Sequence, residues 1–133
     1  MADQKKINEW MEYWVKSSKE DLKTMEALYK SGRYAFCLFL GHLVLEKALK
    51  ALAVGKIGKP VPKTHNLRHL VELAELTLEE YEIKLIAKAN EFNVEARYPE
   101  TKMEFYKLCT KHYMDQFYHP IISLYKKLCQ KMK

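Results

Sequence analysis

Residues 34–54, YAFCLFLGHLVLEKALKALAV, constrain the fold more than any other segment of the chain. Apolar side chains occupy nearly every side of the helix that this segment would form, whereas a surface helix carries them on a single stripe. No segment of the sequence shows the strict alternation of apolar and polar residues that is typical of a half-buried strand. Residues 34–54 therefore predict a central helix that other helices surround.

Four further segments carry apolar residues at the helical spacing of three or four. Gly32 follows the first of them where a helix C-cap is expected. Thr77 with Glu80, and Thr101 with Glu104, have the spacing of capping boxes at the starts of the last two. Two glycines and two prolines predict the longest loop at residues 55–65. The helices are expected at about 6–30, 66–76, 78–92 and 102–131.

The last of these segments supplies a core stripe and contains Pro120, which has no N–H to donate and is expected to kink the helix. Three long helices plus a broken pair predict an all-α, antiparallel up-and-down bundle. We expect one domain over residues 1–133, because no linker or low-complexity segment divides the chain. The residues expected in the core from the last helix are Phe105, Leu108, His112, Phe117, Ile121, Leu124 and Leu128.

The net charge of +6 is concentrated at the end of the chain, where seven lysines and two acidic residues follow Thr101. A basic helix surface attracts phosphates, but lysines on a helix are also ordinary solvated residues, and both interpretations stay open.

The sequence predicts a cytoplasmic protein without membrane contact. Residues 1–10 lack the apolar core of a signal peptide, and the longest apolar run, residues 34–45, is too short to span a bilayer. The cysteines, at positions 37, 109 and 129, are odd in number and form no CxxC pair. They are expected to be reduced packing residues.

Several polar residues fall on helix faces that ought to be buried. Asp21 lies on the apolar stripe of the first helix, where an unpaired carboxylate would be costly to desolvate. In the central helix His42, Glu46 and Lys50 are spaced i, i+4, i+8 and share a face, beside Lys47. We expect these residues to form one buried polar network. It either fixes the helix register or positions a loop residue, for which Arg97 is the candidate.

The segment ARYPE, residues 96–100, precedes the last predicted helix. Pro99 favours an extended conformation at Tyr98, which places Arg97 and Tyr98 at a helix N-terminus, a favourable position for an anion. Arg97 is predicted to grip a phosphate while Tyr98 stacks on a base or sugar, with Lys50 and His65 contributing to the same site. The alternative is an ion pair from Arg97 to Asp21 or Glu46, with Tyr98 packed.

No metal or cofactor is predicted. His65 and His69 are four residues apart but have no glutamate between them in an HExxH arrangement.

Four motifs in order resemble the HEPN domain family, named for higher eukaryotes and prokaryotes nucleotide-binding. They are W-x3-S-x2-D at Trp14, Ser18 and Asp21, GRYAFCLFLGHLVLEKALKAL, PKTHNLRHL at 62–70, and ARYPE. The resemblance extends from about Trp10 to Tyr125. It implies a helical bundle that is usually dimeric and that often acts beside a small nucleotidyltransferase. Some members of the family are ribonuclease toxins or parts of defence systems.

The sequence departs from the ribonuclease members of that family. They carry an Arg followed, after four to six residues, by a His at the start of the last helix. No arginine here has that histidine, since the corresponding positions after Arg97 are Lys102, Met103 and Glu104. The resulting hypothesis is a homodimeric module that binds a nucleotide or RNA phosphate and acts with a nucleotidyltransferase, in a toxin–antitoxin or defence pair. A metal-independent ribonuclease and a purely structural dimerisation module are the alternatives.

Overall fold

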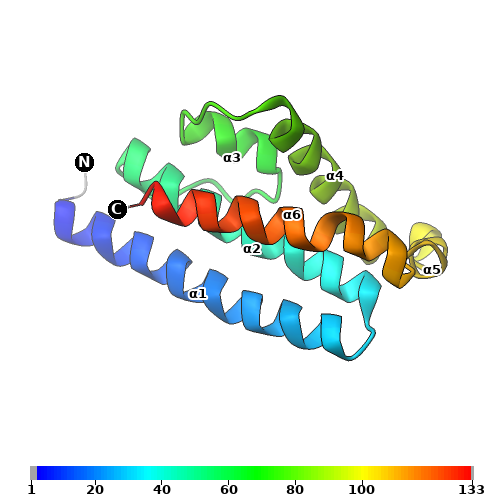
Figure 1. Cartoon of the computed structure of the whole chain (residues 1–133). Helices are drawn as coiled ribbons and strands as arrows, with labels where there is room; N and C mark the ends of the chain where they lie inside the picture. Colours follow the sequence, from blue (N-terminus) through cyan, green and yellow to red (C-terminus); the bar gives the residue numbers. More distant parts are fainter. Residues whose placement is uncertain (1–2, 133) are drawn as a thin grey trace.

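The computed structural model describes residues 3–132, and over that range it contains six α-helices and no strand (Figure 1). Helices α1 and α4 run in one direction, and α2 and α6 run in the other (Figure 1). The predicted all-α, antiparallel bundle is therefore confirmed. The helices are α1 Gln4–Lys30, α2 Tyr34–Ile57, α3 Leu67–Leu73, α4 Glu80–Arg97, α5 Pro99–Leu108 and α6 Lys111–Gln130.

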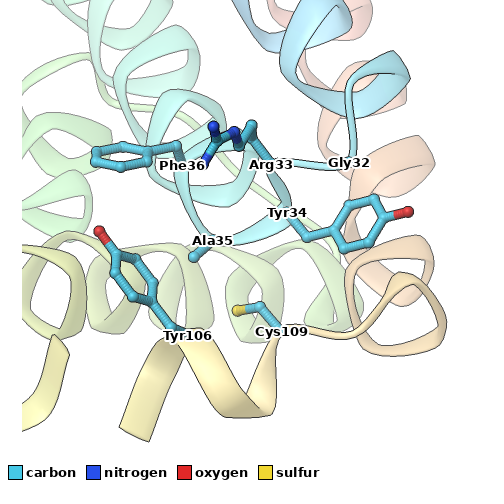
Figure 2. A pocket seen from close by; sticks show the side chains of 7 residues that line it. All are labelled: Gly32, Arg33, Tyr34, Ala35, Phe36, Tyr106 and Cys109. Atoms are coloured by element: carbon cyan, nitrogen blue, oxygen red, sulfur yellow. The ribbon is translucent and has the colours of Figure 1, made fainter. Parts of the chain in front are cut away.

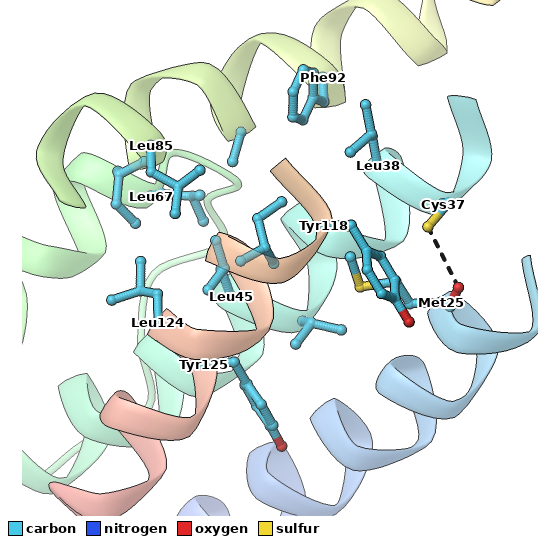
Figure 3. Packing of buried hydrophobic residues seen from close by; sticks show 14 of the residues in the cluster. Met25, Cys37, Leu38, Leu45, Leu67, Leu85, Phe92, Tyr118, Leu124 and Tyr125 are labelled. Atoms are coloured by element: carbon cyan, nitrogen blue, oxygen red, sulfur yellow. Dashed lines mark hydrogen bonds between the residues drawn. The ribbon is translucent and has the colours of Figure 1, made fainter. Parts of the chain in front are cut away.

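Helix α2 is the central helix, as its composition predicts, and packs against α1, α3, α4 and α6. Figure 3 shows the core around it, where Met25 of α1, Leu45 of α2, Phe92 of α4 and Leu124 of α6 contribute to one buried cluster. At Gly41 a Cβ atom would lie 3.0 Å from side-chain atoms of Met25 and Ile121. The missing side chain at Gly41 therefore lets α1, α2 and α6 approach closely.

The single helix predicted over 102–131 is wrong, because Cys109 and Thr110 separate α5 from α6. Thr110 caps the new helix by accepting a hydrogen bond from the amide of Tyr113 at 3.2 Å. The break changes the register, so Leu108 and His112 are exposed rather than buried. Phe117 is only half-buried, and α6 continues through Pro120. The buried residues of α6 are Met114, Tyr118, Ile121, Leu124, Tyr125 and Leu128.

The two predicted capping boxes are not where the helices begin. Helix α4 begins at Glu80, and its Glu82 carboxylate accepts the Glu79 amide at 2.8 Å. The same carboxylate accepts Lys127 Nζ of α6 at 2.9 Å, which ties α4 to α6. Burial alone raises the pKa of Glu82, but the Lys127 ammonium and the Glu79 amide outweigh burial, so the pKa lies below its ordinary value.

Helix α5 begins at Pro99, with Tyr98 as the residue that ends α4 and caps α5. Thr101 therefore lies inside α5, where its hydroxyl donates to the carbonyls of Glu95 and Tyr98. Arg97 is the last residue of α4. Arg97 and Tyr98 thus lie at the junction of two helices, close to the helix N-terminus that the sequence predicts.

Two of the three cysteines, Cys37 and Cys109, are buried. Burial raises the pKa of the Cys37 and Cys109 thiols to about 12, so both stay protonated at neutral pH. Cys129 is partly buried. Within residues 3–132 no helix combines the length and the apolar character needed to cross a membrane.

Candidate functional site

One face of α2 carries ionisable residues into the interior of the bundle. His42, Glu46 and Lys50 follow one another at intervals of four, and their exposed fractions are 0%, 3% and 7%. The loop between α2 and α3 covers this face and places His65 against it. We call His42, Glu46, Lys50 and His65 the Glu46 cluster.

The carboxylate of Glu46 is fully engaged although it is buried. Its Oε2 accepts a hydrogen bond from Lys50 Nζ at 2.9 Å, and its Oε1 accepts one from His65 Nδ1 at 3.0 Å. Lys50 Nζ also lies 4.7 Å from the ring centroid of Trp14, a cation–π distance. The ion pair therefore compensates both buried charges.

His42 holds the backbone of the α2–α3 loop. Its Nε2 donates to the carbonyl of His65 at 2.9 Å, since a carbonyl can only accept. Burial lowers the pKa of His42, and the charges of His65 and Arg97 add to this effect, against the opposing influence of Glu46. His42 is therefore neutral at pH 7. Its Nδ1 has no hydrogen-bond partner among residues 3–132.

His65 is the exposed member of the Glu46 cluster. Half of its side chain, 51%, is accessible, whereas the Glu46 side chain behind it is 4% accessible. Because Nδ1 carries the proton shared with Glu46, Nε2 is the ring atom available to a ligand. This is the carboxylate–imidazole arrangement that fixes the tautomer of a histidine.

Helix α4 carries three polar residues on one face, and the first of them contacts the start of α3. Asn90 accepts the Leu67 amide at 3.0 Å and donates to the side chain of Asn66 at 3.2 Å, so it ties α4 to the start of α3. One turn further, Asn93 is buried, and its Oδ1 has no partner in the described chain. Arg97 follows after another turn and is exposed. Its positive charge is one of the smaller influences that lower the pKa of His42.

The polar network predicted from the sequence is divided in the structure. Asp21 pairs with Lys47, with Nζ and Oδ2 2.6 Å apart, while Glu46 bonds to Lys50 and His65. No ion pair joins these two groups within residues 3–132.

The four residues predicted to bind phosphate are in different environments. Arg97 and His65 are exposed, and Tyr98 is 54% exposed. Lys50 is buried, and Glu46 and Trp14 occupy its ammonium, so it is not available to a ligand. The predicted alternative, an ion pair from Arg97 to Asp21 or Glu46, is wrong, because other cations occupy both carboxylates. Sequence reasoning missed Asn90 and Asn93, although the spacing of Asn93 and Arg97 places them on one face of α4.

The cavity in Figure 2 is separate from the Glu46 cluster. It has a volume of about 220 Å³ and lies between the corner that joins α1 to α2 and the end of α5. Arg33, Phe36 and Tyr106 are among the residues that line it, and none of the Glu46 cluster does. Among the described residues no three His, Cys, Asp or Glu side chains are grouped as metal ligands. We take the Glu46 cluster as the candidate site because it holds an exposed imidazole against a buried carboxylate.

These features define a class of protein, a helical bundle whose central helix holds a buried carboxylate behind an exposed imidazole. Residues 11–131 match the HEPN domain family, and the chain belongs to that family. It is also similar to ST0689, an archaeal HEPN homologue of known crystal structure, with a TM-score of 0.71 and 24% sequence identity. That similarity covers 92% of this chain and 98% of the homologue, and it shows the fold. No curated protein matches the chain.

Proposed function

We propose that this HEPN domain binds a nucleotide or an RNA phosphate at an edge formed by His65, Arg97 and Tyr98. The main support for this proposal is the environment of Arg97. It is exposed and makes no ion pair or side-chain hydrogen bond with any residue of the described range 3–132. A guanidinium without a protein partner is free to bind a phosphate through two parallel hydrogen bonds.

Two further side chains support a nucleotide rather than a simple anion. Tyr98 follows Arg97 directly, and its exposed ring offers a surface for a base to stack on. His65 is also exposed, and its Nδ1 is bonded to Glu46, which leaves Nε2 free for a ligand.

The spacing of these residues indicates the size of the ligand. Asn90 is bonded to Asn66, the residue after His65, and Arg97 lies seven residues further along α4. At 1.5 Å per residue this is about 10 Å along the helix axis. A ligand of about the length of a nucleotide would span that separation.

We further propose that the chain is a homodimer that acts with a small nucleotidyltransferase, in a toxin–antitoxin or defence pair. Large apolar side chains are exposed near the junction of α4 and α5 and at the start of α2. Exposed apolar groups of this kind support a protein contact. They are Phe36, Val94, Met103 and Leu108, with exposed fractions of 42–61%.

The dimer is tested by light scattering coupled to size-exclusion chromatography. We expect the wild type to have the mass of two chains, and a Met103→Glu, Leu108→Glu variant to have the mass of one, because two buried charges would oppose association. A wild type that stays monomeric at micromolar concentration would overturn the homodimer.

The ligand site is tested by calorimetric titration with ATP and with a short single-stranded RNA. We expect binding of at least one of them, and a loss of about 10- to 100-fold in affinity for Arg97→Ala, the range of a charged hydrogen-bonded contact. Lys19→Ala is the matched control, since Lys19 is an exposed cation on the outer side of α1 and its removal changes the net charge equally. Circular dichroism verifies that both variants are folded.

The control separates a local contact from general electrostatic attraction. A similar weakening by Lys19→Ala would mean that net charge, not Arg97, drives binding. If the wild type bound neither ligand, the proposed binding function would be wrong.

A further inference from the structure

We propose that the cavity between the α1–α2 corner and the end of α5 binds a small aromatic anion, a single ring that carries a carboxylate or a phosphate. The cavity shares no residue with the edge formed by His65, Arg97 and Tyr98. This inference therefore goes beyond the proposed function and does not depend on it.

Two aromatic rings face the cavity from different helices. Figure 2 shows Arg33 and Phe36 on the side of α2, and Tyr106 and Cys109 on the side of α5. The ring centroids of Phe36 and Tyr106 are 6.1 Å apart, and their planes are inclined at 49°. Phe36 is 42% exposed, so part of its ring is free to contact a ligand. A third ring can join this pair, because aromatic rings favour tilted contacts at such distances.

Two cations beside the rings have no acidic partner. Arg33 lines the cavity and is exposed. Lys102 Nζ lies 5.8 Å from the ring centroid of Phe36 and 5.7 Å from that of Tyr106, both cation–π distances. Neither cation makes an ion pair within residues 3–132. Two uncompensated positive charges beside one cavity favour an anion.

The lining of the cavity supplies no negative charge that would compete with such an anion. None of the described residues that line it is Asp or Glu. Cys109 is the one acidic group of another kind with a thiol in the lining, and burial raises the pKa of that thiol to about 12. The thiol is therefore neutral at pH 7.

The start of α2 adds a feature that an anion would improve. Arg33 is the N-cap residue, and no side chain caps the helix there, although Ser, Thr, Asp or Asn usually does so. The positive charge of Arg33 also lies at the positive end of the helix dipole, which is unfavourable. An anion would compensate both effects. The main support for the site remains the two cations and the two rings.

The volume of the cavity limits the ligand to about one ring. The cavity measures about 220 Å³. A closed apolar cavity of ~150 Å³ is large enough for benzene, and pockets for drug-sized ligands begin at about 300 Å³. A benzene ring with one acidic group therefore fits, whereas a base, a sugar and a phosphate together do not.

The positions of the side chains indicate how this ligand binds. The ring packs against Phe36 and Tyr106, and its acidic group meets the Arg33 guanidinium, which can donate two parallel hydrogen bonds to a carboxylate or a phosphate. The Lys102 ammonium adds a second positive charge. A neutral ring, or an anion without a ring, makes only some of these contacts and should bind more weakly.

The test is an NMR titration of the isotope-labelled full chain, followed through its amide resonances. Benzoate and phenyl phosphate are the probes. Benzyl alcohol, which lacks the charge, and inorganic phosphate, which lacks the ring, are the ligand controls. Arg33→Gln and Lys102→Gln each remove one cation. Lys107→Gln is the matched control, because Lys107 is an exposed lysine of α5 with no ion pair in the described chain.

We expect at least one probe to bind and to shift the amide resonances of residues 32–36 and 105–109. Arg33→Gln should weaken binding about tenfold or more, the effect of losing a charged hydrogen bond, and Lys102→Gln should weaken it less. Lys107→Gln should leave the affinity unchanged within about twofold. Both ligand controls should bind at least about tenfold more weakly than the better probe. Circular dichroism verifies that the variants are folded.

Four results would overturn the inference. They are no shift with either probe at millimolar concentration, equal affinity in Arg33→Gln, phosphate binding as tight as that of phenyl phosphate, and shifts centred on His65 and Arg97. Phe36 also belongs to the surface proposed for the dimer, and a dimer that covers the cavity would give the first of these results. The nucleotide site is tested separately, with ATP and RNA against Arg97→Ala, so either proposal can fail alone.

Discussion

Replacing Glu46 with alanine is expected to lower the free energy of unfolding by about 3–5 kcal/mol, the usual effect of removing one partner of a buried ion pair. Glu46 neutralises Lys50 and holds His65, and its exposed fraction is 3%. Without it the Lys50 ammonium remains buried at 7% exposure and keeps its cation–π contact with the ring of Trp14. Urea denaturation followed by circular dichroism measures the change.

The matched control removes both charges at once. In Glu46→Leu, Lys50→Met, two apolar side chains of similar volume replace the pair, and most of the lost stability should return. If the double variant were as unstable as Glu46→Ala, lost packing rather than the unpaired ammonium would explain the effect. A change below about 1 kcal/mol in Glu46→Ala would show that Lys50 reaches solvent readily.

Replacing Phe92 with alanine is expected to lower the free energy of unfolding by a similar amount, about 3–5 kcal/mol. Phe92 is 0% exposed and comes from α4. Its ring centroid lies 5.8 Å from that of Phe105 in α5 and 5.2 Å from that of Phe117 in α6. The alanine would leave a cavity between three helices. Chemical denaturation measures the resulting loss in the free energy of unfolding.

Because the cavity in Phe92→Ala lies beside α5, we expect its effect on hydrogen exchange to be largest in that helix. Phe105 is the only residue of α5 that is buried, so α5 depends on its contact with Phe92. Hydrogen exchange in α5 should therefore increase more than exchange in α2. Phe92→Leu is the control, and it should lose less stability because it fills most of the space. Equal losses in the two variants would contradict the cavity explanation.

The sequence determined the α-helical class and the central helix, since these follow from local periodicity and composition. A helix with apolar residues on nearly every side, such as residues 34–54, must be surrounded by other helices, whichever segments of the chain form them. The sequence also determined that buried charges on the central helix need partners. A charge is costly to desolvate whichever residue finally pairs with it. The four HEPN motifs were readable for the same reason, as they depend only on residue order.

The helix boundaries near residues 99–111 were decided by competing local signals. Thr101 has a favourable cap sequence, but Pro99 begins α5 two residues earlier, because its fixed φ angle and missing donor suit the first helical position. Thr110 then caps α6, and the register of every later residue moves with it. Local pattern reasoning cannot rank such signals, because tertiary packing selects between helix starts of similar free energy.

Only the tertiary structure decided which partner each polar residue received. In the sequence, Glu46 is close to both Lys47 and Lys50. Because α1 packs against α2, Lys47 forms an ion pair with Asp21, and Lys50 forms one with Glu46. The chain between α2 and α3 then brought His65 back to a residue nineteen positions earlier. Periodicity carries no information about such contacts, because they depend on how helices and loops pack in space. Within residues 3–132, that packing leaves the Arg97 side chain without an ion pair and places His65 against the carboxylate of Glu46.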